Sequence, residues 1–198
     1  MLNPLAFLYN PQTQWKTFAD TPASKFSFYS TYPFIMSLLP SIAWYYGTTQ
    51  IGWSVDGENT VKLTESSAMV IAALMYVALI GAVIAVGYSV HWMAKTYGSE
   101  TTVFKGIALS AFAATPFFIF GASGFYPSIW IDLILFMVCI CWSVYLLYTG
   151  IPIAMKIPDD RGFMYASAIL SVGMVIFLVL LGSSVILWEM GAAPVFTD

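Results

Sequence analysis

Long uncharged stretches dominate this chain, and most charged residues occur between them. About 20 apolar residues are enough for a helix to cross a bilayer. The stretches predict five membrane-spanning helices, at roughly 32–53, 67–92, 102–120, 127–148 and 162–188. Pro40 predicts a kink in the first of these helices. The third and fourth share one uncharged run, which the segment GASGFYP divides because glycine and proline interrupt a helix.

The composition indicates that lipid surrounds most of the surface of the protein. Of the 198 residues, 60% are hydrophobic and 9% are charged, whereas soluble domains carry about 25% charged residues. In lipid, only helices and closed barrels satisfy the backbone, and long apolar runs favour helices over the alternating pattern of a barrel. The sequence therefore predicts an all-α, polytopic membrane protein that forms one membrane domain over residues 1–198.

The first 25 residues are polar and aromatic, and they form a separate N-terminal segment. Asn10 and Pro11 are suited to the start of a helix, and Trp15, Phe18 and Ala19 then fall on one side. One interpretation is a short helix lying in the headgroup region. The other is a disordered tail, and the sequence does not decide between them.

The basic residues predict the orientation. Six of the seven lie on one side of a path with five crossings, and they are Lys16, Lys25, Lys95, Lys105, Lys156 and Arg161. The other side has Lys62, close to the acidic residues Asp56 and Glu58. Since basic loops stay in the cytoplasm, the N-terminus is expected inside and the C-terminus outside.

Small residues predict a helix-packing face on the third helix. Gly106, Ser110 and Ala114 are spaced by four, so they lie on one side of that helix. Such residues let two helices approach closely. The face is expected to support a compact bundle, and it could equally serve an oligomer interface.

Asp132 is the most suggestive single residue, because it lies in a run that has no other charge from Gly106 to Met155. An ionisable group within a spanning helix suggests a function, since burying it is costly. Asp132 also follows Pro127 by five residues, near a helix N-terminus that favours a negative charge. A structural role and a contact with an ion or a partner are both open.

A charged cluster between the last two helices is the second candidate contact. It consists of Lys156, Asp159, Asp160 and Arg161. The cluster is either a solvated turn or a surface that meets a soluble partner. Asp159 and Asp160 also precede the last helix, where they would cap its N-terminus.

No catalytic residues, metal site or cofactor are predicted. The chain has one histidine, His91, and two cysteines that lie within one apolar run, whereas a zinc site needs several converging ligands. The net charge of −3 and the lack of a basic run argue against nucleic acid as a partner. The expected partners are the lipid bilayer and other membrane proteins or further copies of the chain.

Several segments resemble the Yip family, named for Ypt/Rab-GTPase-interacting proteins, and in particular its bacterial inner-membrane branch. The segments are 43-AWYYGTTQIGWSV-55, 90-VHWMAKTYG-98, 115-TPFFIFGASGFYPSIW-130, 147-LYTGIPIAMKIPDDRGFMYAS-167 and 185-VILWEMGAAPVF-196. The resemblance implies five helices, a cytoplasmic N-terminal segment and location in the bacterial inner membrane. Eukaryotic members bind Rab GTPases through a longer cytoplasmic part, which an N-terminal tail of 25 residues is too short to supply.

Two functional hypotheses follow. The first is a non-enzymatic integral membrane protein that accompanies or organises other membrane components by binding membrane proteins or lipids. The alternative is a small oligomeric transporter or channel that uses Asp132.

Overall fold

The computed structural model describes residues 2–54 and 60–197, so the acidic residues Asp56 and Glu58 lie outside the described residues. Nine α-helices are found there, joined by short 3-10 and π turns. They are α1 (Pro11–Ala19), α2 (Phe26–Tyr29), α3 (Tyr32–Met36), α4 (Leu38–Tyr46), α5 (Glu65–Met93), α6 (Val103–Ala113), α7 (Thr115–Phe120), α8 (Ile129–Met155) and α9 (Asp159–Leu187). The predicted all-α class is confirmed.

Three helices of the described chain are long and apolar enough to cross a membrane. With their short continuations they cover Glu65–Tyr97, Ile129–Met155 and Asp159–Ala192. A fourth crossing results if Val103–Ala113 and Thr115–Phe125, which meet at 49°, are one bent span. A count of five is therefore not confirmed, although the polytopic helical architecture is.

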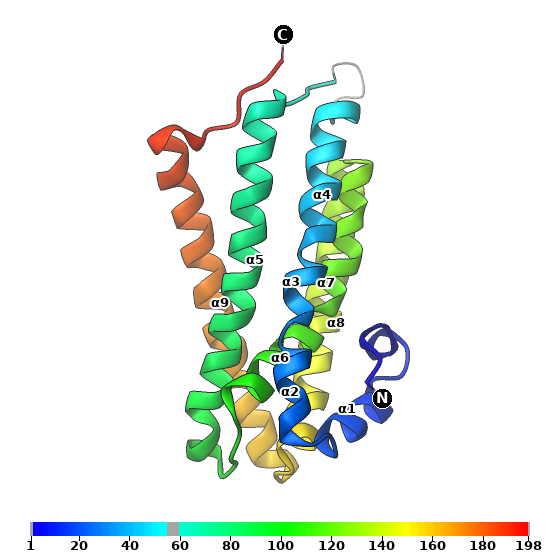
Figure 1. Ribbon diagram of the computed structural model, residues 1–198, viewed down its shortest axis with the longest axis vertical. Helices are drawn as coiled ribbons and strands as arrows, with labels where there is room; N and C mark the ends of the chain where they lie inside the picture. Colours follow the sequence, from blue (N-terminus) through cyan, green and yellow to red (C-terminus); the bar gives the residue numbers. More distant parts are fainter. Residues whose placement is uncertain (1, 55–59, 198) are drawn as a thin grey trace.

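The first predicted helix is divided into shorter pieces. Helix α3 ends at Met36 and α4 begins at Leu38. Pro40 lacks the N–H that would bond to the Met36 carbonyl, and its ring clashes with that carbonyl. Figure 1 shows α2, α3 and α4 following one another up the bundle beside α7. The break between α6 and α7 has the same cause, since Pro116 cannot donate to Phe112 and the chain bends at Ala114.

Helix α8 continues beyond the predicted end at Tyr148 and reaches Met155. Pro152 lies inside it. Membrane helices tolerate such a proline when neighbouring segments cover the bend. Here Gly162 of α9 approaches so closely that a Cβ on it would lie 2.7 Å from Cβ of Pro152.

Burial is concentrated at one end of the bundle, the lower end in Figure 1, where α5 and α8 finish and α9 begins. We call it the basic end because Lys95, Lys105 and Lys156 lie there. In α9 the buried residues are confined to its first third and are Gly162, Tyr165, Ala166 and Ile169. In the most apolar stretch of α5, and likewise of α9, only 6% of the residues are buried inside the protein. These two helices are therefore largely exposed over the opposite half of the bundle.

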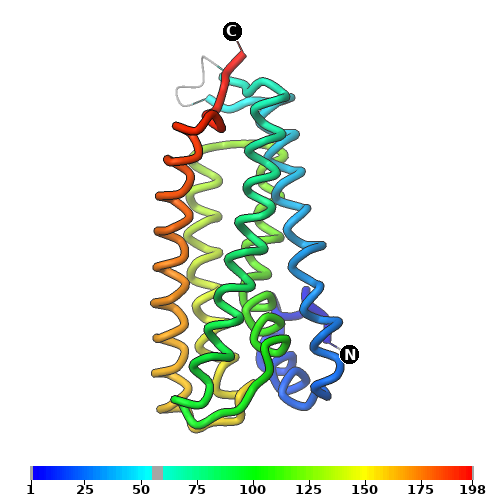
Figure 2. The backbone as a smooth tube through the Cα atoms, turned by 60° about the vertical axis from the view of Figure 1, so that its left-hand side comes forward, coloured from blue at the N-terminus to red at the C-terminus, as the bar shows by residue number. Residues whose placement is uncertain are grey.

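The opposite end, which we call the C-terminal end, is closed by the last residues of the chain. The N–H of Thr64 donates to the carbonyl of Val195, and the N–H of Thr197 donates to that of Lys62, both at 2.9 Å. The rings of Trp53 and Phe196 lie 6.1 Å apart. Figure 2 shows this segment reaching from the end of α9 to the start of α5. Backbone pairing thus ties the start of α5 to the segment that follows α9.

The N-terminal segment packs into the protein. Helix α1 forms as one interpretation expected, yet Trp15 and Phe18 are fully buried within the chain instead of facing headgroups. Phe7 lies edge-on to Trp15, with ring centroids 4.6 Å apart, and stacks on Phe112 of α6 at 4.9 Å. We call these four residues together with Phe26, whose ring is 4.8 Å from that of Phe18, the N-terminal aromatic cluster.

Gly150 of α8 makes room for this cluster. A Cβ at Gly150 would lie 2.4 Å from the indole of Trp15, closer than any packed side chain tolerates. The indole therefore sits directly on the α8 backbone. An aromatic ring in this position buries a large apolar surface and holds α1 against the bundle.

Replacing Trp15 with alanine is expected to release the N-terminal segment. Loss of a fully buried aromatic side chain costs about 3–5 kcal/mol, because the cavity it leaves cannot collapse completely. Tryptic cleavage after Lys16 and Lys25 in detergent-solubilised protein should become faster. Tyr9→Ala, which removes an exposed aromatic residue from the same segment, is the matched control and should cleave at the wild-type rate. Equal rates for all three proteins would contradict the docking.

Candidate functional site

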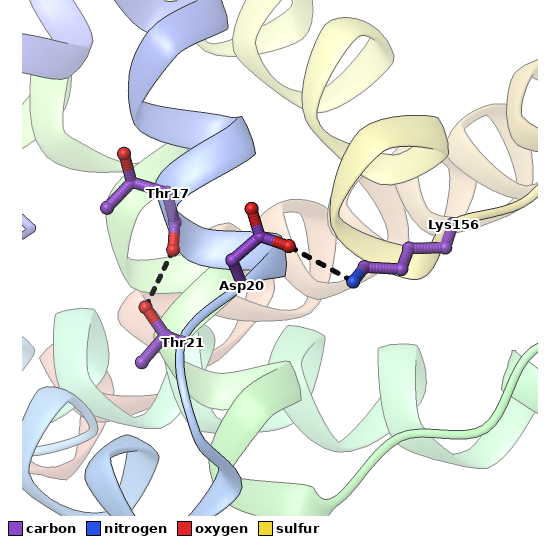
Figure 3. A network of polar contacts seen from close by, with 4 residues as sticks. All are labelled: Thr17, Asp20, Thr21 and Lys156. Atoms are coloured by element: carbon purple, nitrogen blue, oxygen red, sulfur yellow. Dashed lines mark hydrogen bonds and ion pairs between the residues drawn. The ribbon is translucent and has the colours of Figure 1, made fainter.

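The charged cluster between α8 and α9 begins with Lys156, which contacts the N-terminal segment. Lys156 ends α8 with a left-handed φ of 53°. Its Nζ lies 3.1 Å from Oδ1 of Asp20, at the end of α1 (Figure 3). The hydroxyl of Thr21 donates to the carbonyl of Thr17 at 2.8 Å and closes the last turn of α1 beside this ion pair.

The ion pair itself adds little stability. The side chains of Lys156 and Asp20 are 64% and 77% exposed. Water and salt screen such a pair, which typically contributes no more than about 1 kcal/mol. The contact therefore orients the loop and the end of α1, while the N-terminal aromatic cluster supplies the stabilisation.

Arg161 contacts a different loop. It lies in the first turn of α9, beside Gly98 of the connection between α5 and α6. Gly98 has a φ of +78°, and a Cβ there would lie 2.6 Å from a guanidinium nitrogen of Arg161. Next to it, the hydroxyl of Ser99 donates to the carbonyl of Met155 at 3.2 Å. The two loops are thus packed on each other.

Asp159 and Asp160 lie in the first turn of α9, and both are exposed. Negative charges at this position are favoured by the helix dipole. The four residues of the predicted cluster therefore do not converge on one point. Lys156 faces α1, Arg161 faces the loop at Gly98, and the two aspartates lie at the helix start.

Lys105 of α6 is a residue of this end that sequence reasoning did not single out. It is half-buried, and its Nζ lies 5.9 Å from the ring of Phe18 and 5.8 Å from the ring of Phe26. An ammonium over aromatic faces is stabilised by their quadrupoles. No local pattern relates position 105 to positions 18 and 26, so only the folded chain reveals this contact.

The small-residue face of α6 packs against α5. A Cβ on Gly106 would lie 2.2 Å from the carbonyl oxygen of Gly87. The hydroxyl of Ser110 donates to the carbonyl of Val83 at 2.8 Å. Ala114, at the end of α6, packs against the smaller apolar cluster that includes Val83. These residues hold two helices of the same chain together, so the face is occupied within one molecule.

Asp132 lies at the other end of the bundle, in the first turn of α8. Its Oδ2 accepts a hydrogen bond from the N–H of Ser128, the residue before the helix, at 2.9 Å. The contact satisfies a backbone donor that the helix leaves free. Oδ1 is buried and has no hydrogen-bond partner among the described residues. One oxygen thus has a structural role, and the other is buried without a partner in this part of the chain.

Metal ligands and the single histidine are the remaining groups to consider. Within residues 2–54 and 60–197, no group of three or more His, Cys, Asp and Glu residues is placed to hold a metal ion. His91 Nδ1 lies 2.8 Å from the carbonyl oxygen of Thr101, a contact that joins α5 to the following loop. The contacts described for the candidate residues are contacts within the chain.

The fold and these contacts define a polytopic α-helical membrane protein whose ends are tied by loops and terminal segments. The chain belongs to the Yip1 domain family, whose model matches residues 5–181. It is similar to inner membrane protein YohC of Escherichia coli K12, with 31% identity over 163 residues, 82% of this chain and 84% of the relative. YohC of Escherichia coli O6:H1 matches equally well. The resemblance expected from the sequence motifs is confirmed, and no solved structure matches the chain.

Replacing Gly106 with alanine is expected to destabilise the protein. The new Cβ would meet the Gly87 backbone, and overpacking of this kind typically costs about 1–3 kcal/mol. Gly173→Ala is the matched control, because no heavy atom lies within 4 Å of a Cβ there and alanine favours a helix. In detergent, Gly106→Ala should lower the melting temperature, whereas Gly173→Ala should preserve or raise it. Identical melting of both variants would exclude the close α5–α6 contact.

Proposed function

We propose that this protein is a non-enzymatic component of the bacterial inner membrane that accompanies or organises other membrane proteins. It would act as one membrane domain, with further copies of the chain or other membrane proteins as partners. The name of the relative YohC, an inner membrane protein, supports this location. The basic residues support an orientation in which the N-terminus and the basic end face the cytoplasm.

The observation that carries the proposal is the exposure of the helices at the C-terminal end. In α9, Met174, Leu178 and Ile186 are each more than 60% exposed. Lipid or other helices must cover these side chains in a membrane. Gly173 and Gly182 of the same helix have open space where a Cβ would stand. The two glycines are nine residues apart and therefore lie on opposite sides of α9. Each leaves room for another helix to approach closely, which favours helical partners over lipid alone.

The alternative, a transporter or channel, has less support from the geometry. A transport path needs polar groups inside the membrane. Among the described residues, the buried polar side chains are all serine or threonine. Asp132 lies at a helix end and caps it through Ser128. Among the described residues, α6 and α7 are the one pair of helices that is long and apolar enough for a span and is bent by more than 40°, whereas transporters typically pair two broken helices at midplane.

Photo-crosslinking along α9 in cells tests the proposal. A crosslinking amino acid would be placed in turn at positions 174–186, and the products would be identified by mass spectrometry. We expect adducts of one defined membrane protein, or of a second copy, whose yield repeats every three to four positions because a partner covers one face. Exclusive labelling of lipid at every position would contradict an organising role.

Asp132→Asn provides the control for the alternative. It removes the charge that a transporter would need while keeping an oxygen that can accept the Ser128 N–H. The pattern of adducts along α9 is expected to stay unchanged in this variant. Loss of the pattern would link partner binding to Asp132 and favour the alternative.

A further inference from the structure

A cavity of about 350 Å³ lies between α4, α5, α7 and α8, near the C-terminal end of the bundle. Its walls include aromatic and aliphatic side chains of all four helices, among them Trp44, Leu79, Phe117, Phe120 and Phe136. Asp132 also lines it and is the one acidic or basic residue of the lining among the described residues. The cavity therefore combines one charge with an apolar, aromatic wall.

The carboxylate of Asp132 is only partly satisfied within the chain. The N–H of Ser128 binds Oδ2, as described above, and fixes the orientation of the group. The buried Oδ1 has no partner among the described residues. A buried carboxylate oxygen without a partner is costly, and a cationic group at that position would remove the cost.

The aromatic side chains of the wall favour the same sign of charge. Rings of tryptophan and phenylalanine attract cations through their negative faces. Trp44 is held in place by Gly124, where a Cβ would lie 2.6 Å from Cδ1 of the indole. Phe117 and Phe136 meet edge-on with centroids 6.0 Å apart, which joins α7 to α8 at the wall.

We propose that this cavity binds a small lipophilic ammonium cation. The ammonium group pairs with the carboxylate of Asp132, and the apolar part of the ligand fills the space between the rings. This inference is independent of the proposed organising role, since it concerns a half-open cavity between α4, α5, α7 and α8 and not the outer face of α9.

Other cations and lipids fit less well. Calcium and magnesium need six or more oxygen ligands, whereas the cavity offers the Asp132 carboxylate and the hydroxyl of Ser123 as its side-chain oxygens among the described residues. A phospholipid with an ammonium headgroup also carries a phosphate, which Asp132 would repel. A volume of about 350 Å³ is moreover at the lower end of the range for small-molecule sites.

Equilibrium dialysis with radiolabelled benzyltrimethylammonium tests the proposal on the purified full chain in maltoside detergent. We expect saturable binding of one cation per chain. Neopentylbenzene, the uncharged analogue with carbon in place of nitrogen, should not compete for the site. Phosphatidylethanolamine and calcium chloride should not displace the cation either. Displacement by either of these would replace the proposed ligand with a lipid or a metal ion, and no saturable binding would overturn the site altogether.

Two variants assign the binding to the cavity. Asp132→Asn preserves the hydrogen bond to Ser128 and should weaken binding by at least about tenfold, as removal of one partner of a buried ion pair does. Trp44→Leu should weaken it about two- to fivefold through loss of the ring. Asp160→Asn, at the opposite end of the bundle, is the matched control and should bind as the wild type does.

A third variant tests whether binding needs the space of the cavity, without changing the charge of Asp132. Leu79→Trp is expected to fill the cavity while Asp132 and its helix cap stay intact, and it should abolish binding. Each variant is compared with the wild type only if its melting temperature is unchanged. Wild-type affinity in Asp132→Asn, or in a folded Leu79→Trp, would overturn the proposal.

Discussion

The architecture depends on close approaches between neighbouring segments that only glycine permits. In lipid, the hydrophobic effect does not drive helices together as it does in water. Van der Waals contacts at short range are therefore needed to stabilise a membrane bundle. At the basic end these contacts occur where Gly87 meets Gly106, where Gly150 receives Trp15 and where Gly162 meets Pro152. All three contacts lie in the same half of the molecule. In the other half, glycines join α4 to the turn between α7 and α8, where Gly124 meets Trp44 and Gly121 meets Pro40. The apolar stretches of α5 and α9 remain exposed there.

This asymmetry gives the two ends different properties. The basic end is a packed unit in which the N-terminal segment and two loops cover the helices, so its charged residues orient the loops instead of forming one binding site. The C-terminal end is tied by backbone pairing between the last residues and the start of α5. Between these ends, α5 and α9 expose apolar surface. This exposed apolar surface supports the proposal that other helices pack against the bundle.

The sequence predicts the elements better than the contacts between them. Uncharged runs locate the helices that became α5, α8 and α9, because each run is long enough to cross a bilayer. The kink at Pro40 follows from its missing N–H, although the division of the first predicted helix after Met36 exceeds the expected kink. The docking of Trp15 on Gly150 could not be predicted, since nothing local relates residues so far apart. For Asp132, the sequence indicated both a helix-capping role and a binding role. Only the folded chain shows that Oδ2 caps the helix and that Oδ1 has no partner among the described residues.

The measurement that tests the account most directly is the accessibility of spin labels on α9 to molecular oxygen, with the full chain in liposomes. Oxygen concentrates in the apolar part of a bilayer, so it reports contact with lipid. Labels at Ala166 and Ile169, which are buried, should be shielded. Labels at Leu178 and Gly182, which are exposed, should be accessible in the isolated chain. Equal shielding at all four positions would contradict a helix α9 that is packed at its first third and exposed beyond it.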